Sequence, residues 1–122
     1  MAEYLTTLQT LAIWHRIVSR SLSELPHDFT TRQLSLLLSV YLQPGPHTVR
    51  SLAQSLNISK AAVCRAIDTL SEAGLVKRKK DETDRRNVFI QRTIQGSVFL
   101  SDFADILMQE LEPLKIKELV AA

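Results

Sequence analysis

Residues 48–92 read TVRSLAQSLNISKAAVCRAIDTLSEAGLVKRKKDETDRRNVFIQR, and this stretch decides the fold. On either side of Asn57, apolar residues recur at intervals of three and four, the spacing of one buried face on each of two helices. Thr48 and Ser59 stand where these helices begin, and their hydroxyls suit N-caps because they can accept unpaired backbone N–H groups. Gly74 stands where the second helix would end with a positive φ. Two short helices joined by a tight turn predict a helix-turn-helix.

The residues after Gly74 predict a β-hairpin. Two strand-like runs, LVKRKK at 75–80 and NVFIQR at 87–92, flank a polar tip at 81–86. The tip carries Arg85 and Arg86, and arginine on a projecting hairpin suits the narrow, negative minor groove of DNA. The stretch therefore predicts a winged helix-turn-helix, with a recognition helix at 59–73 and a wing at 77–92.

The outer face of the predicted recognition helix is small and basic in its leading half. Arg65 would form a bidentate pair with guanine O6 and N7, and Lys60 would reach guanine or a phosphate. The alternative for Arg65 is an exposed charge paired with Asp68 or Glu72, which contributes only roughly a few tenths of a kcal/mol. The predicted DNA contacts are Thr48, Arg50, Ser59, Lys60, Ala61, Cys64, Arg65, Lys77, Lys79, Arg85 and Arg86.

This stretch resembles the MarR family of bacterial transcription regulators. The family's wing signature, Asp-x-Arg, five residues, Leu-Thr, two residues and Gly, is similar to the run from Asp84 to Gly96. The residues at 58–60 and 74–76 also resemble the family's entry to and exit from the recognition helix. Arg92 is a departure, because it stands where the family usually has Leu.

The resemblance implies a dimeric DNA-binding regulator, most often a repressor. It also implies that Arg86 pairs with Asp84 and holds the hairpin in shape, whereas the residues alone do not separate this role from that of Arg85. In the family, aromatic acids bind between the first helix, the second helix and the dimer surface. Trp14 and His15 would line such a pocket here, and the favoured alternative is that they pack at a dimer interface.

Composition places the chain among ordinary globular proteins. A length of 122 residues fits one domain at 1–122, and 45% hydrophobic with 23% charged residues excludes a disordered class. No apolar run approaches the roughly 18 to 20 residues of a membrane span, and the N-terminus lacks a signal-peptide pattern. A single cysteine fits a reducing compartment, so we predict a cytoplasmic protein with no membrane partner.

The positive charge is concentrated on the predicted winged helix-turn-helix. Residues 47–92 hold ten Lys and Arg against five Asp and Glu, a net +5, whereas residues 93–122 hold two against five. Such a segment is the electrostatic footprint of a nucleic-acid binder. The partner predicted is double-stranded DNA, and the alternative is a solvated basic hairpin without a partner.

The segments outside this stretch predict helices at 4–25, 31–42 and 94–111, with a break at Pro113 and a short helix at 114–120. A capping box of Thr30 and Gln33 opens the second helix, whose apolar content predicts the centre of the fold. The first and last helices carry apolar residues on more than one face, so each needs a second partner surface. The main stripe of the first helix comprises Tyr4, Leu8, Leu11, Val18, Leu22 and Leu25, while Ile13 and Ile17 lie outside it.

The fold class predicted is mainly α with a small β-hairpin wing. Terminal helices at 1–25 and 94–122 would form a dimerisation region around a DNA-binding unit at 31–92. A two-fold dimer would place its recognition helices roughly 34 Å apart on a pseudo-palindromic site.

Other chemistries find little support. The three histidines lack metal-ligand spacing, and no nucleophile, phosphate loop or paired carboxylates form a catalytic set. We therefore predict no enzyme, no metal and no cofactor. Oxidation of Cys64 would disturb DNA contact, although a lone helical cysteine is more often a small filler. The alternative functions are an architectural DNA binder and a protein-binding winged helix, neither with a small-molecule effector.

Overall fold

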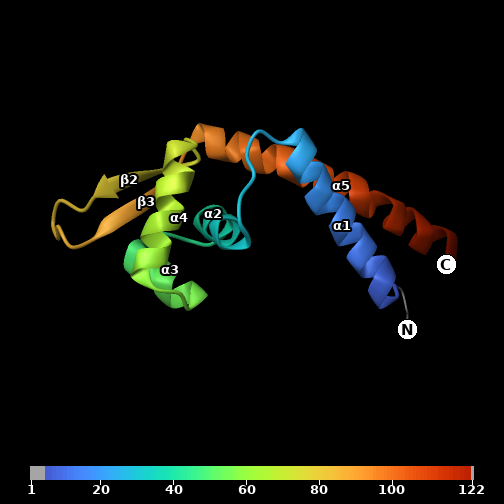
Figure 1. Cartoon of the computed structure of the whole chain (residues 1–122), viewed down its shortest axis with the longest axis horizontal. Helices are drawn as coiled ribbons and strands as arrows, with labels where there is room; N and C mark the ends of the chain where they lie inside the picture. The colour runs from blue at the N-terminus through green and yellow to red at the C-terminus, as the bar shows by residue number, and fades with distance from the viewer. Residues whose placement is uncertain (1–4, 122) are drawn as a thin grey trace. The chain divides into compact units, whose positions relative to one another are not determined.

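The computed structural model describes residues 5–121, with side chains described for residues 5–112. It is mainly helical with one small sheet, as predicted (Figure 1). The elements in order are α1 (Thr7–Glu24), α2 (Thr31–Leu42), β1 (His47–Thr48), α3 (Val49–Leu56), α4 (Lys60–Glu72), β2 (Val76–Lys80), β3 (Val88–Arg92) and α5 (Ile94–Ala121). Internal contacts divide the chain into two units, one holding the described residues up to Asp28 and from Leu100 onward, the other Phe29–Phe99. That one domain spans 1–122 stays a prediction.

Helix α2 forms the centre of the second unit, as its apolar content predicts. The side chains of Leu36, Leu37 and Val40 are fully buried. At its start, the Thr30 hydroxyl accepts from the Gln33 N–H and the Gln33 side chain accepts from the Thr30 N–H, which is the predicted capping box. Two otherwise unpaired backbone donors are thereby satisfied.

The helix-turn-helix begins and ends at the predicted residues. The Thr48 hydroxyl accepts from the Ser51 N–H at 3.0 Å and caps α3, and the Ser59 hydroxyl accepts from the Ala62 N–H at 3.0 Å and caps α4. Asn57 takes a left-handed φ of 54° at the joint. Gly74 has a φ of +79° just after α4, a backbone geometry that glycine adopts without steric cost.

The wing is an antiparallel hairpin of β2 and β3 that projects beyond α3 and α4 (Figure 1). The short strand β1 pairs with the other edge of β3, so that the sheet order is β1-β3-β2. The strand β1 was not predicted, because a strand of two residues has no periodicity to detect. Its pairing partner, β3, lies about 40 residues later in the chain.

The hydroxyl of Tyr41 joins α2 to both stems of the wing. It accepts from the Thr93 N–H at 2.8 Å and donates to the Leu75 carbonyl at 2.7 Å. The Thr93 hydroxyl donates to the Gly74 carbonyl at 2.7 Å and accepts from the Gly96 N–H, so Thr93 caps the start of α5. The two ends of the hairpin are thereby held together against α2.

Arg92, the departure from the family pattern, binds the C-terminal end of α2. Its Nε donates to the Val40 carbonyl at 2.8 Å, and its guanidinium lies 5.8 Å from the centre of the Tyr41 ring. A cation at a helix C-terminus is favourable because the last carbonyls carry partial negative charge. The guanidinium therefore fastens β3 to α2 at a position where Leu would offer only apolar contact.

In the first unit, α1 packs on α5 through Ile13, Ile17 and Ile106. Ile13 and Ile17 lay outside the predicted stripe of α1. Within that stripe, Leu8 is 78% and Leu22 is 60% exposed. Tyr4, another member of the stripe, lies outside the described residues. Periodicity found an apolar arc, but it did not show which part of the arc faces the core.

Ion pairs also join α1 to α5. The Arg16 Nε lies 2.8 Å from one oxygen of Glu110, and an Arg20 Nη lies 3.0 Å from the other. Arg20 also pairs with Glu24 one turn along α1, at 2.6 Å. Hydrogen bonds from Arg16 and Arg20 lower the pKa of the Glu110 carboxyl below its ordinary value.

The predicted break at Pro113 and the separate helix at 114–120 are wrong, because α5 runs without interruption from Ile94 to Ala121. The fixed φ of proline, about −65°, is close to that of a helix, so a long helix can continue past it with one backbone hydrogen bond lost. Among the described residues, no helix is long and apolar enough to cross a membrane.

We expect Gly96→Ala to destabilise the fold. A Cβ at this buried position would collide with the Tyr41 hydroxyl and with the Leu75 carbonyl oxygen. Overpacking of this kind costs about 1–3 kcal/mol, which exceeds the roughly 1 kcal/mol that alanine gains over glycine inside a helix. The measurement is the midpoint of urea unfolding at fixed protein concentration.

Gly45→Ala is the matched control, because the nearest atom to its added Cβ would be the His47 Cδ2 at 3.5 Å, an ordinary contact. Equal midpoints for the two variants would show that the junction at Tyr41 tolerates a methyl group.

Candidate nucleic-acid interface

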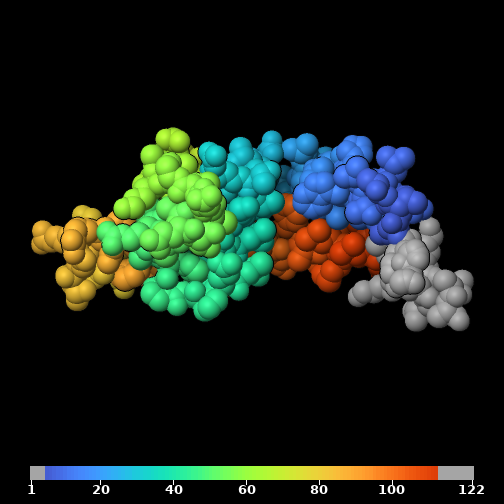
Figure 2. Space-filling view, turned by 90° about the horizontal axis from the view of Figure 1, so that it is seen from below, coloured from blue at the N-terminus to red at the C-terminus, as the bar shows by residue number. Residues whose placement is uncertain are grey.

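The exposed face of α4 presents a small, basic surface. Lys60, Ala61, Cys64 and Arg65 are all exposed, and their spacing places them on one side of the helix. The opposite side is fully buried through Val63, Ile67 and Leu70. Because that buried side packs against α2 and α3, the exposed side of α4 faces outward. Figure 2 shows α3, α4 and the wing along one face of this unit.

Arg65 does not form the salt bridges that were the alternative to DNA contact. Within the described part of the chain, no hydrogen bond or ion pair involves the side chain of Arg65 or of Lys60. Asp68, the nearest predicted partner, is instead bound by Arg78 at 2.6 Å. The two cations are therefore free to bind an external acceptor.

Arg78 links the wing to α4, a contact that the sequence analysis missed. One Nη donates to the Asp68 carboxylate and, at 3.3 Å, to the Cys64 carbonyl. Arg78 lies opposite the buried Ile90 in the β2–β3 register, so it belongs to the sheet face that meets α4. Alternation of side chains along β2 could have predicted this position, because it places Arg78 on the same face of the sheet as Val76. As an exposed pair it adds little stability, and it joins β2 of the wing directly to α4.

The wing tip is ordered by two aspartates. Asp84 accepts from the Arg86 backbone N–H at 3.1 Å, from its Nε at 3.1 Å and from an Nη at 3.2 Å. Asp81 accepts from the Thr83 hydroxyl at 2.7 Å and from the Thr83 N–H at 2.9 Å. Arg86 therefore has the structural pairing that the resemblance implied. The side chain of Arg85 is exposed and has no partner among the described residues.

These hydrogen bonds lower the pKa of both carboxyl groups. The side-chain hydrogen bond from Arg86 is the largest cause for Asp84, followed by the Arg86 backbone N–H. The Thr83 hydroxyl is the largest cause for Asp81. In each case the fold favours the charged carboxylate, which is the form that accepts these bonds.

The other predicted contacts occupy different positions. Thr48 and Ser59 use their side-chain oxygens as helix caps, and Arg50 is exposed in the first turn of α3. Lys77 and Lys79 lie opposite Gln91 and Phe89, on the sheet face away from α4. The structure thus groups Lys60, Ala61, Cys64 and Arg65, places Arg85 at the tip, and separates Lys77 and Lys79 from both.

Arg32 is a basic residue near Arg65 that the sequence analysis did not single out. A hollow of about 660 Å³ between the start of α2 and α4 is lined by both arginines, together with Thr31, Ser35 and Thr69. The only feature of the sequence that could have pointed to Arg32 is its place in the first turn of the helix that precedes the helix-turn-helix. The hollow extends the positive surface from α4 onto α2.

Trp14 and His15 are both exposed on α1, and Trp14 retains 52% of its accessible surface. A small-molecule pocket at these residues stays a prediction. Cys64 is a free, exposed thiol. Among the described residues, no group of three or more His, Cys, Asp or Glu side chains is arranged to hold a metal ion.

A helix-turn-helix whose second helix is followed by a β-hairpin defines a winged helix-turn-helix protein. The model of the MarR family matches residues 27–87, which is half of the chain. The chain belongs to the MarR family. Since this is a family of transcription regulators, membership confirms the prediction that the chain is not an enzyme.

Individual relatives agree with this assignment. The chain is similar to the uncharacterized HTH-type transcriptional regulator YhbI of Bacillus subtilis, at 34% identity over 79 residues, 65% of this chain and 51% of YhbI. The chain thus spans about half the length of this relative. A MarR-like transcriptional regulator from Thermotoga maritima shares 31% identity and a TM-score of 0.57, covering 88% of this chain and 82% of that chain. A mutant of S. aureus MepR bound to an oligodeoxyribonucleotide shares the fold, with 21% identity, a TM-score of 0.76, and coverage of 90% of this chain and 78% of that one.

We expect the wing tip to lose its order as the pH falls. The pKa of the Asp84 carboxyl is lowered in the folded state from its ordinary value of 3.8. Such a group stabilises the folded state fully when the pH is above the unfolded pKa. This stabilisation is lost as the pH falls through the lowered, folded-state pKa. The measurement is an NMR titration that follows the backbone amides of Thr83 and Arg86 through the acid range.

Asp84→Asn should remove the pH response of the Arg86 amide and leave that of Thr83, which Asp81 binds. The buried amide of Leu37 reports global unfolding. If the Arg86 amide titrates identically in Asp84→Asn and in the unchanged chain, Asp84 does not order the tip.

Proposed function

We propose that the chain is a sequence-specific regulator of transcription that binds double-stranded DNA as a homodimer and acts as a repressor in the cytoplasm. The recognition helix at 59–73 would occupy the major groove, and the wing at 77–92 would reach the minor groove. The observation that carries this proposal is the exposed side of α4, where the side chains of Lys60 and Arg65 have no partner among the described residues.

The two kinds of contact would contribute differently. Phosphate contacts from basic residues such as Arg32, Arg50 and Lys60 would supply affinity that falls with salt, because bound counterions are released. Arg65 would supply base discrimination through a bidentate pair with guanine. Arg86 is engaged with Asp84, whereas the side chain of Arg85 at the same tip is free. Arg85 is therefore suited to the minor groove. The oligonucleotide bound to the MepR mutant supports this use of the shared fold.

The proposed dimer surface is the exposed apolar side of the first unit. Leu8, Leu11, Trp14 and Leu22 of α1 are all more than half exposed, and so is Met108 of α5. Apolar surface of this extent is costly in water and marks an interaction site. A second copy of the chain would cover it and supply the two-fold symmetry that a pseudo-palindromic operator requires.

Selection of bound DNA from a random double-stranded pool, at about 0.15 M salt, tests the proposal. We expect an inverted repeat with half-sites roughly 10 bp apart. Sequence-blind binding would favour an architectural role. Absence of binding even at low salt would favour a protein-binding winged helix.

On the selected site, Arg65→Ala should cost about 1–3 kcal/mol of binding free energy and relax specificity at one base pair per half-site. Arg65→Lys is the matched variant, because it keeps the charge and loses the bidentate geometry. We expect Arg65→Lys to keep affinity for random DNA while losing the base preference. Equal losses on selected and random DNA in both variants would exclude a base-reading role for Arg65.

The dimer surface has its own test. Leu22→Glu should produce monomers, because it places a charge on apolar surface that the second copy would cover. Leu42→Glu is the matched control, since Leu42 is 74% exposed but lies at the end of α2 in the other unit. Sedimentation equilibrium of both variants reports the oligomeric state, and a dimeric Leu22→Glu protein would contradict the proposed surface.

A further inference from the structure

Asp68 places a negative charge on the exposed side of α4, the side proposed to bind DNA. It lies one turn after Cys64 and Arg65, and 62% of its side chain is exposed. A free carboxylate there repels phosphate groups and the acceptor atoms of guanine, and it attracts any cation within reach. A surface that reads DNA therefore needs this charge to be neutralised.

Within α4, the cation placed to pair with Asp68 is Arg65. Residues three positions apart are neighbours on a helix surface, with about 5–6 Å between their Cβ atoms. The side chain of Arg65 nevertheless forms no hydrogen bond or ion pair among the described residues. The Asp68 carboxylate is bound instead by Arg78, whose Nη lies 2.6 Å from Oδ1. Two arginines thus compete for one carboxylate, and the arginine of the wing holds it.

The position of Arg78 explains why it holds the carboxylate. Arg78 lies opposite the buried Ile90 in the β2–β3 register, on the sheet face that meets α4, and its side chain is 36% exposed. The Nη that binds Asp68 also donates to the Cys64 carbonyl at 3.3 Å, so two acceptors on α4 hold one nitrogen. A pair within one exposed helix lacks this second acceptor and must order two long side chains for a small gain.

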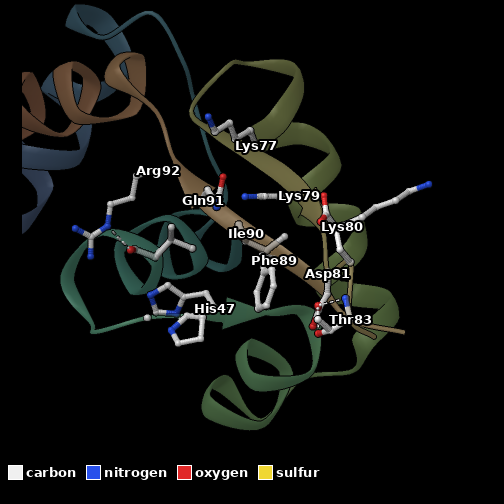
Figure 3. Close-up of a pocket in the computed structure, with 14 residues that line it drawn as sticks. His47, Lys77, Lys79, Lys80, Asp81, Thr83, Phe89, Ile90, Gln91 and Arg92 are labelled. Carbon is white, nitrogen blue, oxygen red and sulfur yellow. Dashed lines mark hydrogen bonds between the residues drawn. The ribbon is translucent and has the colours of Figure 1, made fainter. Parts of the chain in front are cut away.

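Neighbouring cations of the wing are directed elsewhere. Lys77 and Lys79, on either side of Arg78 in the sequence, lie on the opposite face of the sheet. Figure 3 shows that face, where both lysines line a hollow of about 730 Å³. Arg86 is engaged by an aspartate at the tip. Among the described residues, Arg78 is the cation that binds Asp68.

We propose that Arg78 is a positioning residue for base recognition: it holds the carboxylate of Asp68 and thereby keeps Arg65 free to pair with guanine. This inference rests on the proposed function and concerns its specificity. Without Arg78, the Asp68 carboxylate pairs with Arg65 and draws the guanidinium along the helix, away from the base. A freed Asp68 also accepts from cytosine N4, which adds a competing preference. Loss of Arg78 therefore lowers the preference for the selected site by more than the loss of one positive charge explains.

The exchange of partners is measured first without DNA, by ¹⁵N relaxation of the arginine Nε–H groups in the full chain. In the unchanged chain, the Arg65 group should be more mobile than that of Arg78. In Arg78→Gln, the Arg65 group should become more ordered, because Asp68 captures it. Combining Arg78→Gln with Asp68→Asn should make Arg65 mobile again. Equal mobility of Arg65 in all three proteins would overturn the proposal.

The effect on recognition is measured as the ratio of the affinities for the selected site and for random DNA. Arg78→Gln should lower this ratio roughly two- to fivefold, the range that a surface ion pair supplies. The double variant should restore the ratio, because no carboxylate remains at position 68 to capture Arg65, and it has the net charge of the unchanged chain. Asp68→Asn does not repair a merely structural loss, so a ratio that stays low in the double variant would overturn the proposal.

Lys79→Gln is the matched control for charge, because it removes one cation from the same strand on the face away from α4. It should weaken binding to selected and to random DNA in the same proportion. A fall in the ratio equal to that of Arg78→Gln would reduce the effect to charge alone and overturn the proposal. If the unchanged chain prefers no sequence, the proposed regulator fails, whereas the relaxation measurement, which uses no DNA, still decides whether Arg78 keeps Arg65 free.

Discussion

The hydroxyl group of Tyr41 is the point on which the DNA-binding unit depends. It accepts a hydrogen bond from Thr93, which follows β3, and donates one to Leu75, which precedes β2, so both partners lie at the base of the wing. One side chain of α2 thus fixes where the chain enters β2 and where it leaves β3. The arrangement leaves no room for a Cβ at Gly96, because α5 begins in contact with the same hydroxyl. This lack of room is the physical reason for glycine at this position of the family signature.

A second set of contacts determines which cations remain free. Arg78 is bound to Asp68, Arg86 to Asp84 and Arg92 to the carbonyls at the end of α2. Each of these arginines contributes to the net charge of residues 47–92 while acting within the fold. Arg65 and Arg85 have no such partners among the described residues. A count of basic residues therefore overstates the number of cations that are free to bind an external partner.

Most of the DNA-binding unit followed from local signals. The caps at Thr30, Thr48 and Ser59, and the positive φ at Gly74, each concern a few neighbouring residues, so the sequence was sufficient to place them. The strand β1 was missed because its identity depends on an edge of β3 far along the chain. Helix α1 was placed correctly, but its apolar arc is wide, and only packing against Ile106 selects Ile13 and Ile17 as its core side.

The sequence by itself determined that two capped helices and a hairpin form a winged helix-turn-helix, because helix periods, caps and turn residues act over short distances. Only the tertiary structure decided the roles of individual charges. Alternation along β2 separates Arg78 from Lys77 and Lys79, but which side meets α4 depends on how the sheet packs. Likewise, Arg92 could be recognised as a departure, yet its role appears only where the end of α2 meets β3. Hydrogen bonds between residues distant in sequence depend on this packing, and a linear pattern does not contain it.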